Sequence, residues 1–239
     1  MQSLIKQGGL SAAAIDQIKQ KLHELGIEQE QINQKMMELN KAKIDSVLAG
    51  YEDKITQYDE FLGNSEIRLG RLVQSSEAYR KELAKQKEAL AGKYKELGRE
   101  IKYLEYAIAH YKLAPEVLEE YKNKLNELKK VANEIIDKQK ELNKAIIDSK
   151  LIFYDDKKSQ YNQFIENSNI RLGRLTKGSE AYRKELERQR QALEAKNKEQ
   201  KRELDYLKYA ITHYDLLPEV VEEYKRKIHE LGVEIKLYK

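Results

Sequence analysis

The sequence predicts an all-α protein whose long helices pack as antiparallel helical hairpins or as a coiled coil. Charged residues make up 36% of the 239 residues, and there are two prolines and no tryptophan. Leucine, isoleucine, valine and tyrosine recur at spacings of three and four, which is typical of helices with a narrow apolar stripe. The chain also repeats itself at an offset of 103 residues, and a long period of this kind indicates a repeat architecture.

The repeat is clearest in the string Ser-Glu-Ala-Tyr-Arg-Lys-Glu-Leu, which occupies residues 76–83 and returns letter for letter at 179–186. Each copy follows the string Ile-Arg-Leu-Gly-Arg-Leu. Residues 21–26 return in nearly the same letters at 227–232, an offset of twice 103. We therefore expect the chain to begin partway through one repeat and to end partway through a third, as a fragment of a longer array.

Four segments follow from this period. Residues 1–10 contain two adjacent glycines and are expected to form a frayed lead-in. Residues 11–75 are expected to hold a partial first repeat, a long helix followed by an elbow. Residues 76–178 are expected to form one complete helical hairpin repeat, and residues 179–239 a second, truncated one.

The first helix is predicted to begin at the N-cap Ser11 and to continue to about Phe61. Its apolar residues have the spacing of a heptad repeat, with one gap at Gln29. They are Ile15, Ile18, Leu22, Leu25, Ile32, Met36 and Leu39. Gly63-Asn64-Ser65 is predicted to break the helix, residues 66–72 to form a short amphipathic turn, and residues 74–76 to break the chain again.

The second helix is predicted to start after the N-cap Ser76 and to end near Tyr111, and a third to start at Pro115. The second helix has the seam Tyr79, Leu83, Gln86, Leu90, Tyr94, Leu97, Ile101, Leu104, Ile108 and Tyr111. The third has the seam Leu118, Tyr121, Leu125, Leu128, Ala132, Ile135, Gln139, Leu142, Ile146, Ser149 and Phe153. The short link allows the two seams to bury each other in a hairpin. A near-continuous rod that pairs with other chains is the alternative.

The second copy repeats these boundaries, with breaks at Asn167-Ser168 and at 176–179 and a link before Pro218. Its long helix has Asn197 and Gln200 where the first copy has Tyr94 and Leu97. The apolar stripe is thinner there, so we expect the second copy to be the less stable one.

Composition argues against several classes of function. The formal net charge is +4 with the signs mixed along the chain, so nucleic-acid binding is not expected. The chain has no cysteine, which excludes disulfides and thiolate zinc sites. We find no signal peptide and no apolar run approaching the ~20 residues of a membrane span, so no membrane contact is expected from this fragment.

No residue pattern indicates catalysis, and we predict no catalytic, cofactor-binding or metal site and no enzymatic activity. The four histidines have no histidine partner three or four residues away: His23, His110, His213 and His229. The acidic pairs Glu119-Glu120 and Glu222-Glu223 lie near predicted helix starts, where negative charge complements the helix dipole.

Glycines, arginines and tyrosines are also expected to be structural. Gly70 and Gly173 lack the strand and glycine spacing of a phosphate loop. The arginines of the same strings could hold a phosphate or a carboxylate, but we expect them to pair with acids of neighbouring helices. Four tyrosines flank the seams and could widen the hairpin contact or face a second partner. They are Tyr103, Tyr106, Tyr206 and Tyr209.

The chain resembles one family in a progression of short strings. These are Tyr-Asp-Glu-Phe at 58–61, Asn-Ser, Ile-Arg-Leu, Ser-Glu-Ala-Tyr-Arg-Lys-Glu-Leu, and Tyr-Leu-Glu-Tyr-Ala-Ile at 103–108. The progression looks like the helical repeats in tape measure proteins of long-tailed bacteriophages of Gram-positive hosts, and it covers nearly the whole chain.

The resemblance implies a viral structural protein whose helical repeats set tail length. It implies location in the lumen of the virion tail after synthesis in the host cytoplasm, with tail tube or tail assembly chaperone proteins as partners and no small-molecule substrate. Self-association through the heptad seams is a further expectation. The alternative is a coiled-coil adhesin stalk or an intracellular scaffold or binding module.

Overall fold

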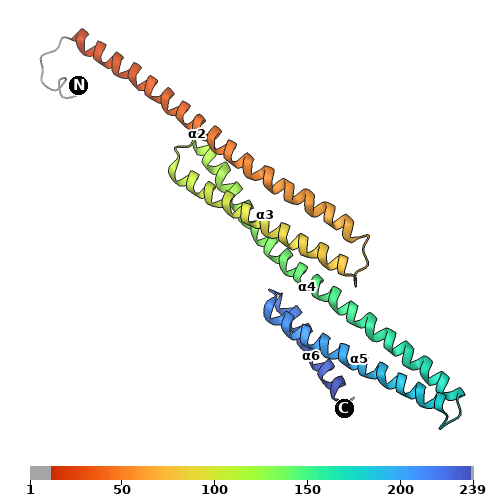
Figure 1. The fold of residues 1–239 in the computed structure, drawn as a ribbon. Coiled ribbons are helices and arrows are strands. Elements are labelled where there is room, and N and C mark those ends of the chain that lie inside the picture. The colour runs from red at the N-terminus through yellow and green to blue at the C-terminus, as the bar shows by residue number, and fades with distance from the viewer. Residues whose placement is uncertain (1–11, 238–239) are drawn as a thin grey trace. The chain divides into compact units, whose positions relative to one another are not determined.

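The computed structural model describes residues 12–237, which form five helices and contain no strand (Figure 1). They are α2 (Ala12–Leu69), α3 (Glu77–His110), α4 (Pro115–Arg174), α5 (Glu180–His213) and α6 (Pro218–Leu237). The all-α prediction is confirmed for this part of the chain. The predicted lead-in 1–10 and the predicted cap Ser11 lie outside the described residues.

The two copies of the repeated string begin helices α3 and α5, as predicted. The Ser76 hydroxyl accepts a hydrogen bond of 3.1 Å from the backbone N–H of Tyr79. The Ser179 hydroxyl accepts one of 3.2 Å from Tyr182. A serine oxygen in this position satisfies one of the N–H groups that a helix start leaves without a partner. Local sequence therefore determines where these two helices begin.

The predicted breaks at Gly63-Asn64-Ser65 and Asn167-Ser168 are wrong, because α2 continues to Leu69 and α4 continues to Arg174. Residues 66–72 are therefore not a separate amphipathic turn. Ser65 is fully buried, and its hydroxyl donates a hydrogen bond of 2.7 Å to Glu82 of α3. Contacts with the neighbouring helix outweigh the weak helix preference of glycine, asparagine and serine. One break therefore separates α2 from α3, and one separates α4 from α5, where two were predicted in each case.

The described chain divides into two compact units. Unit 1 takes the described residues up to Ile55 together with Glu96–Val131. Unit 2 takes Thr56–Lys95 and the described residues from Ala132 onward. Helices α2, α3 and α4 each contribute residues to both units.

The buried core of unit 1 combines side chains from α2, α3 and α4: Ile44, Leu48, Leu104, Ala107 and Tyr121. Each has a counterpart 103 residues later in the core of unit 2, where Ile147, Leu151, Leu207, Ala210 and Tyr224 are buried together. In unit 2, helices α5 and α6 pack directly against each other. The same residue types thus occur at five matching positions in both cores.

Candidate functional site

Polar contacts of the described residues recur at the 103-residue offset. The Tyr121 hydroxyl donates a hydrogen bond of 2.7 Å to Asp45, and the Tyr224 hydroxyl donates one of 2.8 Å to Asp148. Both tyrosine rings are buried, and burial raises the pKa of both phenols, which the neighbouring aspartates raise further. These contacts join helices that are distant in sequence.

A second repeated contact lies beside the link that precedes α3 and α5. The guanidinium of Arg68 lies 2.6 Å from the Glu82 carboxylate, and that of Arg171 lies 2.6 Å from Glu185. The hydrogen bond from Ser65 and the pairing with Arg68 lower the pKa of Glu82. Pairing with Arg171 is the main cause of the lowered pKa of Glu185. For Arg68 and Arg171, the expected pairing with acids of neighbouring helices is therefore present.

Glu100 and Glu203 are buried carboxylates at matching positions of α3 and α5. The ammonium of Lys124 lies 3.3 Å from Glu100 and 2.5 Å from Glu52. The ammonium of Lys158 lies 2.7 Å from Glu203. Burial raises the pKa of both Glu100 and Glu203, against the attraction of their lysines. Sequence reasoning missed this pair, because nothing in the local pattern shows that these glutamates face inward.

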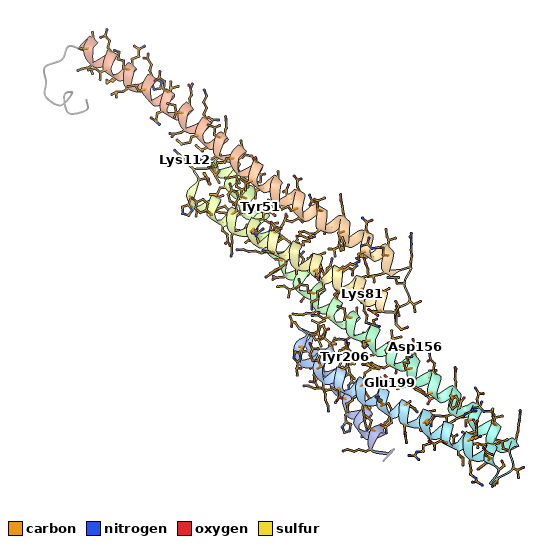
Figure 2. The ribbon with its side chains drawn as sticks, in the orientation of Figure 1. Tyr51, Lys81, Lys112, Asp156, Glu199 and Tyr206 are labelled. Carbon is orange, nitrogen blue, oxygen red and sulfur yellow. The ribbon has the colours of Figure 1, made fainter. Side chains whose placement is uncertain are left out.

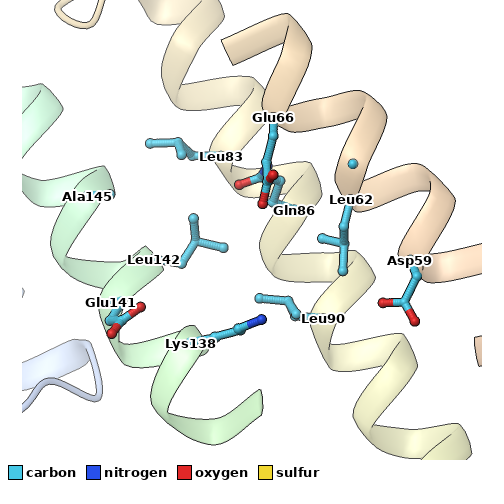
Figure 3. Close-up of a pocket in the computed structure, with 11 residues that line it drawn as sticks. Asp59, Leu62, Glu66, Leu83, Gln86, Leu90, Lys138, Glu141, Leu142 and Ala145 are labelled. Carbon is cyan, nitrogen blue, oxygen red and sulfur yellow. The ribbon is translucent and has the colours of Figure 1, made fainter. Parts of the chain in front are cut away.

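A pocket of about 560 Å³ lies within unit 2 between α2, α3 and α4 (Figure 3). Figure 3 shows Leu142 of α4 beside Leu83 and Leu90 of α3. The charged residues of the lining are Asp59, Glu66, Lys138 and Glu141. In residues 12–237 no group of three histidine, aspartate or glutamate side chains is arranged to hold a metal ion. The pocket has both apolar and charged walls, and residues of all three helices line it.

Two of the four histidines belong to repeated aromatic pairs. His110 stacks on Tyr106 with ring centroids 4.2 Å apart, and His213 stacks on Tyr209 at 3.9 Å. In each pair Nδ1 of the histidine lies 2.9 Å from the backbone carbonyl oxygen of the tyrosine. A histidine four residues after a tyrosine lies about one turn of helix away, and this spacing is a sequence signal that could have indicated these pairs. The other two, His23 and His229, are exposed on α2 and α6.

The remaining flanking tyrosines contact other aromatic rings. Tyr103 lies 6.3 Å from Tyr51, and Tyr206 lies 6.3 Å from Tyr154, measured between ring centroids (Tyr51 and Tyr206 in Figure 2). These pairs add apolar contact between helices, which is one of the two roles that the sequence suggested.

The predicted acidic pairs and glycines also have places in the helices. Glu120 lies 3.4 Å from Lys41, and Glu223 lies 3.6 Å from Lys144, which is the same contact 103 residues later. Gly70 follows the last residue of α2, whereas Gly173 lies inside α4. These residues therefore belong to helix contacts and helix ends.

None of the helices within residues 12–237 has a stretch apolar and long enough to cross a membrane. Comparison with protein families, with curated proteins and with solved structures finds no match.

Proposed function

We propose that the chain is a structural length element, folded as antiparallel helical hairpins in tandem 103-residue repeats, from a phage tail tape measure protein. The observation that carries the proposal is the recurrence of contacts between distant helices. Tyr121 with Asp45 and Tyr224 with Asp148 make the same hydrogen bond at the 103-residue offset. Repetition of a packed unit is the way in which a chain adds length in equal steps.

The family resemblance supplies the specific role in a tail. In each repeat the chain leaves helical structure at two links, residues 70–76 and 111–114 in the first. We propose that these links are the hinges at which a hairpin opens when the protein extends in the tail lumen. One fully helical, extended repeat of 103 residues would span roughly 155 Å, at about 1.5 Å per residue.

An in-frame deletion of residues 76–178 in the encoding phage or prophage tests the proposal. The deletion removes one period, so the repeat-matched contacts are retained: Ser65 would meet Glu185 where it now meets Glu82. We expect tails shorter by roughly 155 Å in electron micrographs. A duplication of the same residues is the matched control and should lengthen tails by the same amount.

Two outcomes would overturn the proposal. The first is unchanged tail length in both phages. The second is a gene neighbourhood that encodes a wall anchor or a recognition head instead of tail proteins, which would favour the adhesin stalk or scaffold.

A further inference from the structure

Helix α2 carries an exposed apolar stripe, which we call the α2 stripe: Leu22, Leu25, Ile32, Met36 and Leu39. Ile32 is 56% exposed and Leu39 is 71% exposed. In unit 1 the N-terminal part of α2 extends beyond the link between α3 and α4 (Figure 1). Farther along, Asn33 contacts Lys112 of that link and Lys41 contacts Glu120 of α4. A contiguous apolar surface on one helix face indicates an interaction site.

The positions 103 residues after the α2 stripe show how the matching seam of α4 is covered. Ile135 and Leu142, which stand 103 residues after Ile32 and Leu39, are 3% and 9% exposed. Leu142 lies in unit 2 against Leu83 and Leu90 of α3. Helix α3 runs antiparallel to α4 here. Leu83 and Leu90 of α3 lie near Leu142, whereas the earlier residue Arg80 lies over Phe153, which comes later in α4. The same seam is therefore one that this protein covers with an antiparallel helix.

The contacts of α2 with its own unit lie to one side of the stripe. Asn40 donates a hydrogen bond of 3.0 Å to the Lys112 carbonyl, and the Lys112 ammonium donates one of 3.1 Å to Asn33 (Lys112 in Figure 2). Beyond Leu39 the next position of the seam is Lys43, whose ammonium lies 5.2 Å from the centre of the Tyr111 ring. The apolar stripe thus ends at Lys43.

The matching seam of α4 favours one orientation of a helix pair. Helix α3 covers that seam in the antiparallel orientation, so we place a second copy of α2 antiparallel on the α2 stripe. With Leu22 opposite Leu39, residues 12–21 of the second copy lie along residues 40–49 of the first, where Lys43 and Ser46 are exposed.

Charge selects one antiparallel register. Pairing Leu22 with Leu39 of a second copy places Leu25 opposite Met36 and Gln29 opposite Ile32, so every residue of the stripe is covered. In this register Glu28 flanks the seam beside Lys35 of the second copy, and the pair occurs twice by symmetry. A shift of one heptad toward the N-terminus sets Lys21 against Lys35 and Glu28 against Glu28. Like charges at flanking positions disfavour that register.

We propose that two copies of this chain form an antiparallel dimer through the α2 stripe, in the register that pairs Glu28 with Lys35. Gln29 is the one polar residue in the seam and weakens the pairing, because its amide lies opposite the apolar side chain of Ile32. The dimer does not depend on the proposed tail function, so the two can fail separately.

Sedimentation equilibrium of the full chain tests the dimer. We expect a monomer–dimer equilibrium in the micromolar range. Ile32→Asp should raise the dissociation constant by at least about 100-fold, because the change enters the dimer twice and each buried charge weakens it by about tenfold or more. Gln29→Leu should tighten it. A wild-type chain that stays monomeric at high micromolar concentration overturns the proposal.

A matched pair of variants separates association from folding. Ile32→Asp should leave the circular dichroism spectrum and the monomer's unfolding transition unchanged, because Ile32 is exposed in the single chain. Ile135→Asp places the same charge at the repeat-matched buried position and should lower the unfolding temperature. Loss of folding in Ile32→Asp would contradict the placement of the stripe on a free surface.

Two further experiments test the orientation and the register. The chain has no cysteine, so introduced cysteines report directly. Oxidising a mixture of Leu25→Cys and Met36→Cys should link the two variants to each other, whereas Met36→Cys alone should not link to itself. Self-linking of Met36→Cys indicates a parallel pair and overturns the proposal.

Charge reversal tests the register. Lys35→Glu should weaken the dimer, and adding Glu28→Lys should restore it. A double variant that binds no more tightly than Lys35→Glu refutes the register.

Discussion

The hydroxyl of Tyr121 donates a hydrogen bond of 2.7 Å to the carboxylate of Asp45, 76 residues earlier in the chain. The Tyr121 ring is buried in the core of unit 1, and its hydroxyl reaches the partly exposed carboxylate of Asp45. The contact thus ties the start of α4 to α2. Tyr224 makes the matching contact with Asp148 in unit 2.

Replacing either phenol with a phenyl ring should therefore destabilise the protein. Tyr121→Phe and Tyr224→Phe each keep the ring and remove one hydrogen bond to a charged acceptor, so we expect each to lower the free energy of unfolding by about 1.5–3 kcal/mol. Urea denaturation measures this. Tyr106→Phe is the control, because Tyr106 is 52% exposed and should show almost no change. Equal effects in all three variants would refute the role given to the two hydrogen bonds.

The ionisation of Glu100 and that of Glu82 should affect the free energy of unfolding in opposite directions as pH changes. The folded-state pKa of Glu100 is raised by burial, so the ionised group costs stability as pH rises above the ordinary glutamate pKa. The folded-state pKa of Glu82 is lowered by Ser65 and Arg68, so the group contributes stability that is lost as pH falls through its pKa range.

Two glutamine variants measure these signs. Relative to the wild type, Glu100→Gln should gain stability as pH rises above about 4.3, the ordinary glutamate pKa. Glu82→Gln should lose stability relative to the wild type as pH rises toward about 4.3 from below. The measurements therefore extend from about pH 3 to about pH 7. Thermal unfolding across this range is the measurement. Parallel pH curves for Glu100→Gln and the wild type would show that burial does not disfavour the Glu100 carboxylate.

Two glycines on facing helices should respond in opposite ways to alanine. A Cβ added at Gly63 meets no atom within 4 Å, so Gly63→Ala should stabilise α2 by about 0.5–1 kcal/mol through its higher helix propensity. A Cβ added at Gly92 would lie 2.6 Å from the Tyr58 ring, so Gly92→Ala should destabilise the protein by about 1–3 kcal/mol. Chemical denaturation compares them. A destabilising Gly63→Ala would mean that α2 bends at this position.

Gln200 stands in α5 where α3 has Leu97, and both side chains are buried, with 2% and 1% exposure. The Gln200 amide donates to Glu234, but its oxygen accepts no hydrogen bond from the described residues. We expect Gln200→Leu to stabilise the protein by about 1 kcal/mol and Leu97→Gln to destabilise it by about 1–3 kcal/mol. Both are measured by denaturant titration. If Gln200→Leu is destabilising, the prediction that the second repeat has the weaker core fails.

Local chemistry made the helix starts predictable. Ser76 and Ser179 accept hydrogen bonds from the first turns of α3 and α5, and Pro115 and Pro218 begin the next helices. These signals act within a few residues of the boundary, so no knowledge of the neighbours is needed. The ends of α2 and α4 were not predictable in this way, because a buried hydrogen bond from Ser65 to Glu82 holds the helix through Gly63.

The sequence by itself therefore determined the helical class and the capped boundaries, since both depend on short-range spacing, and its strings recur at an offset of 103 residues. It also showed the seams, but not which of them are covered. Ile32 and Ile135 occupy the same position of the same seam, yet one is 56% exposed and the other 3%. Only the tertiary structure decided this difference, and likewise turned Glu100 inward, because burial depends on which helices lie alongside and not on the letters of the helix itself.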